Sequence, residues 1–308
     1  MSEKIRKYKK KYLNVLSVNT LILILAIVFL TIGFDIQKKY DFFGQLITEL
    51  LIVLLPALLI ARTGYTRTIL RLNKISLKDI FFTITIVILA YPIILLLNGL
   101  FMSLFSSVME FKNSTHQLIT LDTSMYNYLV FYCIVPAICE EVFFRATVMN
   151  AYEIFGSKFA ILMSSLVFAL FHFDIQNFMA PFLLAILFAN ILNLTNSIYA
   201  AIIAHFTNNV IAVLFSRYVG DDFFKLLWQT KIAREIGSLQ LFIIILLILI
   251  SIISSILLKF LFKHFKKESL KNKEGRLVYR QVEGIDLFNF VPILGLVILY
   301  IIYYYIVF

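Results

Sequence analysis

Long apolar stretches separated by short polar segments run along the whole chain, and they limit the folds that are open to it. The first lies behind the basic N-terminus and reaches Phe34, and the last runs from Phe288 to Phe308. About 20 apolar residues let a helix cross a bilayer, where every backbone polar group must be satisfied internally. The sequence therefore predicts an all-α fold, a polytopic transmembrane helix bundle with eight or nine spans.

The composition agrees with a membrane protein and argues against a nucleic-acid partner. Hydrophobic residues make up 61% of the 308 residues and charged residues 15%, with a mean hydropathy of +0.92. Soluble domains have about 45–50% apolar and about 25% charged residues. The net charge of +10 comes from lysines and arginines clustered near the ends of the apolar stretches, which is the pattern of the positive-inside rule. We therefore expect a lipid bilayer, and no nucleic acid, as a partner.

The basic segments indicate a topology. Between the first and last spans, we place spans at residues 43–61, 80–105, 128–149, 158–173, 178–194, 198–215 and 241–258. The basic segments 1–12, 62–79 and 259–280 then fall on one side, which is predicted to be cytoplasmic. The first apolar run is too long for a signal peptide and lacks a small-residue cleavage site, so it is expected to remain. The lysine-rich, glycine-poor composition favours a bacterial plasma membrane, with the N-terminus in the cytoplasm.

The fourth span, Tyr128 to Met149, contains three charged side chains, those of Glu140, Glu141 and Arg145. A charge at the centre of a span costs ~2.5–3.5 kcal/mol on insertion scales, so three cost roughly 9 kcal/mol. The ten Leu, Ile, Phe and Val residues of this run return only about 3–6 kcal/mol, at ~0.3–0.6 each. The helix must therefore face a polar interior, and intramembrane charges of this kind indicate a functional site.

The spacing of these charges suggests a division of roles. Glu141 and Arg145 are four residues apart, so they share a helix face and can form an ion pair that offsets part of their desolvation cost. Glu140 is turned about 100° from Glu141 and lacks an equally placed partner on its own helix. A buried carboxylate near another carboxylate is a better proton acceptor near neutral pH. Glu140 is therefore the candidate general base, and Glu141 and Arg145 are supporting residues.

Two further motifs lie on later spans. Phe168 and His172 share a face of the fifth span, and His205 and Asn209 share a face of the seventh. The two imidazoles and the amide could orient water, polarise a carbonyl or stabilise an oxyanion, and Phe168 is expected to pack behind His172. Alternatively, a zinc ion held by Glu140, His172 and His205 could carry the attacking water. The sequence leaves the cofactor open between zinc and none.

Taken together, the motifs Glu140-Glu141-x-x-x-Arg145, Phe168-x-x-x-His172 and His205-x-x-x-Asn209 resemble the CPBP family of intramembrane proteases, which includes the eukaryotic CAAX prenyl endopeptidase. Three short motifs in this order on consecutive predicted membrane helices are a specific signal. The resemblance covers residues 126–213, the protease-like core of what we expect to be one membrane domain over residues 1–308. It implies peptide-bond hydrolysis by water activated at Glu140 with His172, and an oxyanion site formed by His205 and Asn209. Metal-dependent and metal-free mechanisms have both been proposed for the family.

The predicted topology leaves a question of depth. His172 lies near the outer end of the fifth span, whereas Glu140 lies nearer the middle of the fourth. For the two side chains to meet, we expect a tilt, a longer fifth span, or a helix break near Pro136.

Three functions remain to be compared. The leading hypothesis is an intramembrane endopeptidase that hydrolyses a membrane-associated or lipid-modified peptide. The second is a non-catalytic immunity or scaffold protein that binds a peptide, since the resemblance extends to bacterial relatives linked to bacteriocin self-immunity. The third is a proton-coupled transporter that uses Glu140 and the histidines as a relay. The joint presence of a base, two imidazoles and Asn209 favours the endopeptidase, because a binding protein needs no base.

Overall fold

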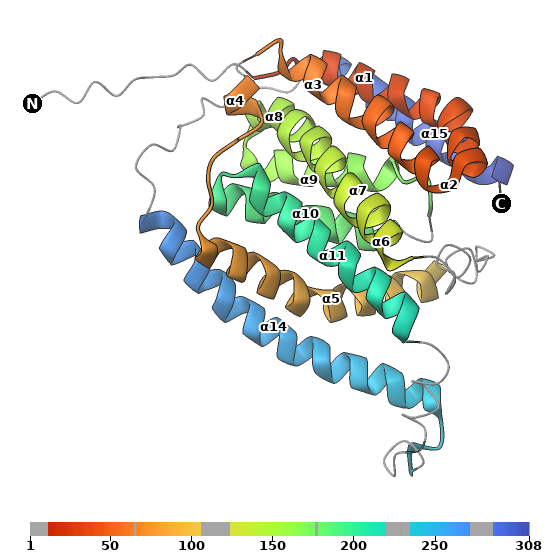
Figure 1. The fold of residues 1–308 in the computed structure, drawn as a ribbon, viewed down its shortest axis with the longest axis vertical. Coiled ribbons are helices and arrows are strands. Elements are labelled where there is room, and N and C mark those ends of the chain that lie inside the picture. The colour runs from red at the N-terminus through yellow and green to blue at the C-terminus, as the bar shows by residue number, and fades with distance from the viewer. Residues whose placement is uncertain are drawn as a thin grey trace, which may run out of the picture.

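The structure is a computed structural model that describes residues 12–64, 66–105, 124–175, 178–219, 229, 235–271 and 286–307. All regular secondary structure in these ranges is helical, and the helices pack side by side as a bundle (Figure 1). The predicted all-α membrane fold is confirmed. Residues 1–11 and 272–285, to which the sequence assigns basic cytoplasmic segments, lie outside the described residues.

The chain begins with a helical hairpin. Its elements are α1 (Val15–Val28), the π-helical η1 (Phe29–Gly33), α2 (Phe34–Thr48), the π-helical η2 (Glu49–Leu54) and α3 (Leu55–Ala61). The chain turns back at Asp41, whose φ of 45° is left-handed and breaks α2 into two arms. Gly44 lets the arms approach, because a Cβ atom there would lie 2.7 Å from Gln37 Cα. The Gln37 side chain also donates to Thr48 Oγ1 at 2.8 Å across the hairpin.

The segment that carries the acidic doublet forms a rod of short helices in the middle of the bundle. It consists of α6 (Met125–Asn127), η4 (Tyr128–Ile134), α7 (Val135–Glu140), η5 (Glu141–Val148) and α8 (Met149–Tyr152). Both η4 and η5 are π-helical, a rare geometry that is frequent at functional sites. Every residue from Glu141 to Met149 is buried, so this charged stretch is shielded by protein as the sequence requires.

The remaining helices surround the rod. They are α4 (Thr66–Ile69), α5 (Leu77–Phe105), α9 (Ser157–Leu170), α10 (Met179–Thr195), α11 (Ile198–Tyr218), α14 (Leu239–Lys271) and α15 (Val291–Val307), preceded by the 3₁₀ turn η7 (Leu287–Phe290). Figure 1 shows α1, α2, α3 and α15 on one side of the rod, and α5 and α14 on the other. The short helices α9 and α10 and the longer α11 pack between these two sides.

Five described helices are long and apolar enough to cross a membrane: residues 15–61, 77–105, 198–218, 239–267 and 287–306. The first of these contains the hairpin turn at Asp41 and so matches two predicted spans. The helices α9 and α10 have 14 and 17 residues and are shorter than the roughly 20 residues of a full span.

Two predicted boundaries are wrong. The fifth span was expected to reach Phe173, but α9 ends at Leu170 because the chain turns there and Phe173 adopts a left-handed φ of 50°. The eighth span was expected to end at Leu258, but α14 continues to Lys271. Lysine side chains can bury their stems and extend their ammonium groups to water, so basic residues need not end a helix.

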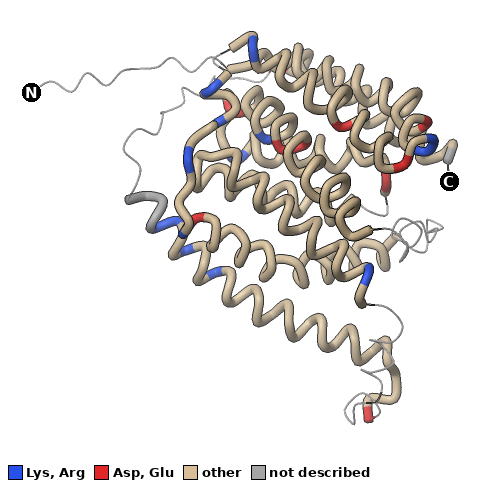
Figure 2. Tube along the Cα trace, viewed as in Figure 1, with Lys and Arg blue, Asp and Glu red and all other residues tan. Residues whose placement is uncertain are grey.

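The charges are distributed unevenly (Figure 2). Most described lysines and arginines gather at the end of the bundle where α4 and the C-terminal part of α14 lie. This is the arrangement expected from the positive-inside rule for a multi-pass membrane protein.

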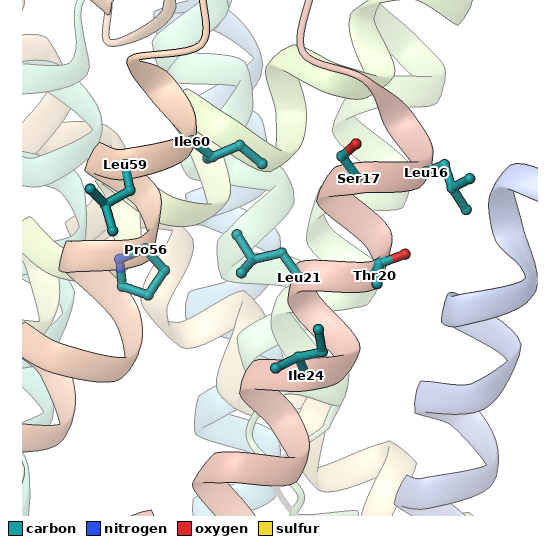
Figure 3. A pocket seen from close by; sticks show the side chains of 8 residues that line it. All are labelled: Leu16, Ser17, Thr20, Leu21, Ile24, Pro56, Leu59 and Ile60. Carbon is teal, nitrogen blue, oxygen red and sulfur yellow. The ribbon is translucent and has the colours of Figure 1, made fainter.

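An apolar groove lies between α1 and α3 (Figure 3). It is lined by Leu16, Ser17, Thr20, Leu21, Ile24, Pro56, Leu59 and Ile60. Among the described residues that line it, the polar side chains are the two hydroxyls, and no candidate site residue is among them. This groove therefore offers no acid or base for catalysis.

Candidate active site

The rod is irregular at Pro136, and this irregularity involves a candidate site residue. Proline has no N–H, so the carbonyl four residues earlier, that of Tyr132, loses its usual helical donor. The amide Nδ2 of Asn209, on α11, donates to this carbonyl oxygen at 2.9 Å. The backbone stays helical through Pro136, where the π-helical η4 passes into α7, so the expected helix break is absent and Asn209 joins this position to α11. Asn208 Nδ2 donates in turn to Asn209 Oδ1 at 3.1 Å.

Glu141 lies at the centre of the polar contacts. Its Oε2 atom is 3.0 Å from Arg145 Nε, so the ion pair expected from the spacing is present and fully buried. Its Oε1 atom is 2.9 Å from Nδ1 of His205. A carboxylate on one ring nitrogen sets the orientation and tautomer of an imidazole. Glu141 therefore holds both the arginine of its own helix and the histidine of α11.

Arg145 is enclosed by aromatic rings as well as paired with Glu141. Its side chain is 1% exposed, and its guanidinium carbon lies 4.4 Å from the ring centre of Phe168 and 5.6 Å from that of Phe188. A desolvated guanidinium on an aromatic face is stabilised by the quadrupole of the ring. The arginine therefore has no direct route to a substrate and supports the residues around it.

Glu140 differs from its neighbour because it is partly open. Its side chain is 17% exposed, and its Oε2 atom is 3.8 Å from Nε2 of His205. This distance is too long for a hydrogen bond, but it places a carboxylate and an imidazole nitrogen around the same small space. His205 thus lies between the two adjacent glutamates, with Nδ1 toward Glu141 and Nε2 toward Glu140.

Two phenylalanines hold the imidazole of His205. The ring of Phe188, on α10, stacks on it with centroids 5.2 Å apart and an interplanar angle of 23°. The ring of Phe168, on α9, meets it edge-on at 6.1 Å. Aromatic contacts on a ring that is also hydrogen-bonded leave it little freedom to turn. The position of His205 is therefore determined by four elements of the bundle.

His172 lies in the turn that follows α9, with its side chain exposed. Its Nδ1 atom is 2.8 Å from the carbonyl oxygen of Phe168, and its ring meets the Phe168 ring with centroids 4.7 Å apart. The hydrogen bond at Nδ1 leaves Nε2 as the nitrogen available to a ligand. Within the residues that the structure describes, no hydrogen bond or ion pair joins His172 to Glu140 or His205. The two histidines are connected through the ring of Phe168, which contacts both.

The zinc alternative requires Glu140, His172 and His205 to converge on one ion. Among the described residues, no group of three or more His, Cys, Asp or Glu side chains is arranged to hold a metal. The residues present do not fit a three-ligand zinc site, so no catalytic step is assigned to a metal.

One acidic residue beside this cluster was missed in the sequence. Glu49 begins η2 in the N-terminal hairpin, is only 5% exposed, and its carboxyl group is within hydrogen-bonding reach of that of Glu140. The signal that could have revealed it is the one that revealed Glu140, an acid inside a predicted span. A single acid in a largely apolar run forms no motif, so the sequence does not single it out.

A comparison with protein families bears on residues 123–211, which match the family described as type II CAAX prenyl endopeptidase Rce1-like. The matched residues are similar to that family, and we refer to residues 123–211 as the Rce1-like segment. The resemblance to the CPBP and CAAX proteases is thereby confirmed. No curated protein and no solved structure shows a significant match to the chain.

The Rce1-like segment contains all seven residues singled out in the sequence: Glu140, Glu141, Arg145, Phe168, His172, His205 and Asn209. The Rce1-like family is a protease family. Glu49 lies well before this segment, in a part of the chain that the match does not cover.

Proposed function

We propose that the protein is an intramembrane endopeptidase that hydrolyses a membrane-associated or lipid-modified peptide, with water activated by Glu140. The observation that carries the proposal is the position of His205 between two carboxylates inside the Rce1-like segment. Its Nδ1 atom is 2.9 Å from Glu141 and its Nε2 atom is 3.8 Å from Glu140. An acid that is partly exposed next to a rigidly held imidazole is suited to bind and activate a water molecule.

The hydrolytic step uses these groups in a fixed order. Glu140 removes a proton from water as the water oxygen bonds to the carbonyl carbon of the scissile peptide. The carbonyl oxygen then carries the negative charge, which hydrogen-bond donors stabilise. The carbon–nitrogen bond breaks, and the proton held by Glu140 passes to the leaving nitrogen. Water is consumed, and a carboxylate and an amine are released.

The other groups bind, orient or support. His172 is assigned the role of positioning the water through Nε2, since its Nδ1 atom is occupied by the carbonyl of Phe168. The Asn209 amide uses one hydrogen for the carbonyl of Tyr132, and its second hydrogen is assigned to the oxyanion together with His205. Glu141 and Arg145 keep His205 in place, because Glu141 contacts both side chains.

The test is cleavage of a defined probe by the full-length protein in proteoliposomes. The probe is a quenched fluorogenic peptide that ends in a farnesylated CAAX sequence, and its unprenylated twin shows whether the lipid matters. Glu140→Gln keeps the side-chain size but removes the base, so cleavage should fall at least ~10²–10⁴-fold. The matched control is Glu235→Gln, the same change at an exposed position, which should leave cleavage unchanged.

Full cleavage by the Glu140→Gln variant would overturn the mechanism. A cellular effect that survives this substitution would favour the binding-only immunity function, and proton-coupled flux would favour a transporter. The proposed location is a bacterial plasma membrane with a cytoplasmic N-terminus, and terminal reporter fusions test it.

A further inference from the structure

The carboxyl group of Glu49 is buried beside the proposed general base, and no lysine or arginine of the described residues forms an ion pair with it. Its Oε1 atom accepts a hydrogen bond from Gln45 Nε2 at 3.2 Å. Its Oε2 atom is closed off from water and receives no bond from an N–H or hydroxyl donor among the described residues. The polar group that it meets is the carboxyl group of Glu140. An acid in such a place is costly unless a hydrogen bond satisfies it.

Two carboxyl groups in contact have one favourable arrangement. If both are ionised they repel each other, whereas a single proton between them converts the repulsion into a short, strong hydrogen bond. The buried Oε2 atom of Glu49 and the carboxylate of Glu140 can satisfy each other in this way. The remaining neighbours agree, since no lysine or arginine of the described residues forms an ion pair with either group.

We propose that Glu49 is a positioning residue for Glu140, which it holds through a carboxyl–carboxylate hydrogen bond. The inference rests on the proposed endopeptidase function, in which Glu140 must face both the water and the scissile carbonyl. His205 approaches Glu140 from α11, and Glu49 approaches it from η2 of the hairpin. The proposed base is thereby held between two helices that are far apart in the sequence.

The architecture of the hairpin suits this role. The element η2 packs directly against α7, the helix that ends in Glu140. Gln45 is one helical turn before Glu49 and anchors its other oxygen. A catalytic group gains most from neighbours that fix its orientation on rigid elements. The N-terminal hairpin is therefore part of the active unit, although the Rce1-like segment begins only at residue 123.

The decisive variants are Glu49→Leu and Glu49→Gln. Leucine fits an apolar span and removes a buried acid, so the variant should unfold at the same temperature as wild type or higher. Without the hydrogen bond, Glu140 turns freely, and kcat for the fluorogenic peptide should fall about 10- to 100-fold with KM nearly unchanged. Glutamine restores a donor to Glu140 and should recover most of the lost kcat. A purely structural role predicts instead that stability and activity fall together.

A second readout does not depend on cleavage. Infrared difference spectra of wild type should contain the carbonyl stretch of a protonated carboxyl group, absent from Glu49→Leu and displaced in Glu140→Gln. Glu235→Gln is the control and should leave this band in place.

The outcomes separate the two proposals. Retained activity in Glu140→Gln overturns the endopeptidase mechanism. The role of Glu49 alone is overturned if Glu140→Gln is inactive but kcat is unchanged in Glu49→Leu. It is also overturned if the infrared band is the same with and without Glu49. If wild type cleaves neither peptide, the infrared band still decides whether the two carboxyl groups are paired.

Discussion

Two buried ion pairs in this bundle have the same chemistry and different surroundings. Glu141 and Arg145 pair within the rod, next to His205 and the partly open Glu140. Arg71 and Glu153 pair at the basic end of the bundle, where Arg71 also reaches Asn193. Both pairs are almost fully enclosed, so burial by itself does not mark a catalytic site.

The difference lies in what each pair holds. The Arg71 carbonyl accepts from the amide of Ile198, and Asn193 donates to Ser157 at 2.5 Å, so the second region connects the α4–α5 loop to the ends of α9, α10 and α11. The first region connects the rod to a histidine whose other nitrogen faces an accessible acid. An ion pair therefore points to chemistry only where a titratable group open to water lies beside it.

The largest effect is expected from breaking the pair in the rod. Glu141→Gln leaves Arg145 buried without a counter-charge, which should cost ~3–5 kcal/mol of stability. His205 also loses its carboxylate, and activity should fall roughly 10- to 100-fold, the range for partners that orient a functional histidine. Thermal unfolding and peptide cleavage are measured in parallel.

The double variant Glu141→Gln with Arg145→Met separates the two losses. Removing the orphaned guanidinium should return most of the stability, while cleavage should stay low because His205 is still unsupported. If cleavage recovers together with stability, the Glu141–Arg145 pair contributes only to stability, as is expected for the Arg71–Glu153 pair.

Breaking the pair at the basic end should affect stability alone. Arg71→Met or Glu153→Met singly should cost ~3–5 kcal/mol, and the double variant should recover much of that loss. In all three variants, the cleavage rate per folded molecule should equal that of wild type. The folded fraction is isolated by size-exclusion chromatography before cleavage is measured. A specific loss of kcat in the double variant would extend the active site to this end of the bundle.

A smaller effect is expected at Asn209, a neutral contact in the same region as the first pair. Asn209→Ala removes the donor to the Tyr132 carbonyl, which should cost ~1–3 kcal/mol of stability and lower cleavage about tenfold. Pro136→Ala restores a backbone donor for that carbonyl, so the double variant should regain stability. If cleavage returns as well, Asn209 only repairs the helix and has no part in stabilising the oxyanion.

Much of the fold could be predicted from sequence because its signals are local. Apolar runs indicated the helices, and the four-residue spacing indicated the Glu141–Arg145 pair, which is present at 3.0 Å. The ends of α9 and α14 were not predictable in this way. The left-handed backbone at Phe173 and the helical lysines up to Lys271 depend on the surroundings of each helix end, which the local sequence pattern does not show.

The sequence alone determined that this chain is a helical membrane protein and that the charges of its fourth predicted span must be shielded from lipid, and it singled out seven candidate site residues. Tertiary structure alone decided which of them touch. His205 meets Glu141 across 64 residues and Asn209 meets Tyr132 across 77, and Glu49 reaches Glu140 from a hairpin with no recognisable motif. Helical spacing sets contacts within about one turn. Contacts between helices depend on how whole faces pack, which no single stretch of sequence specifies.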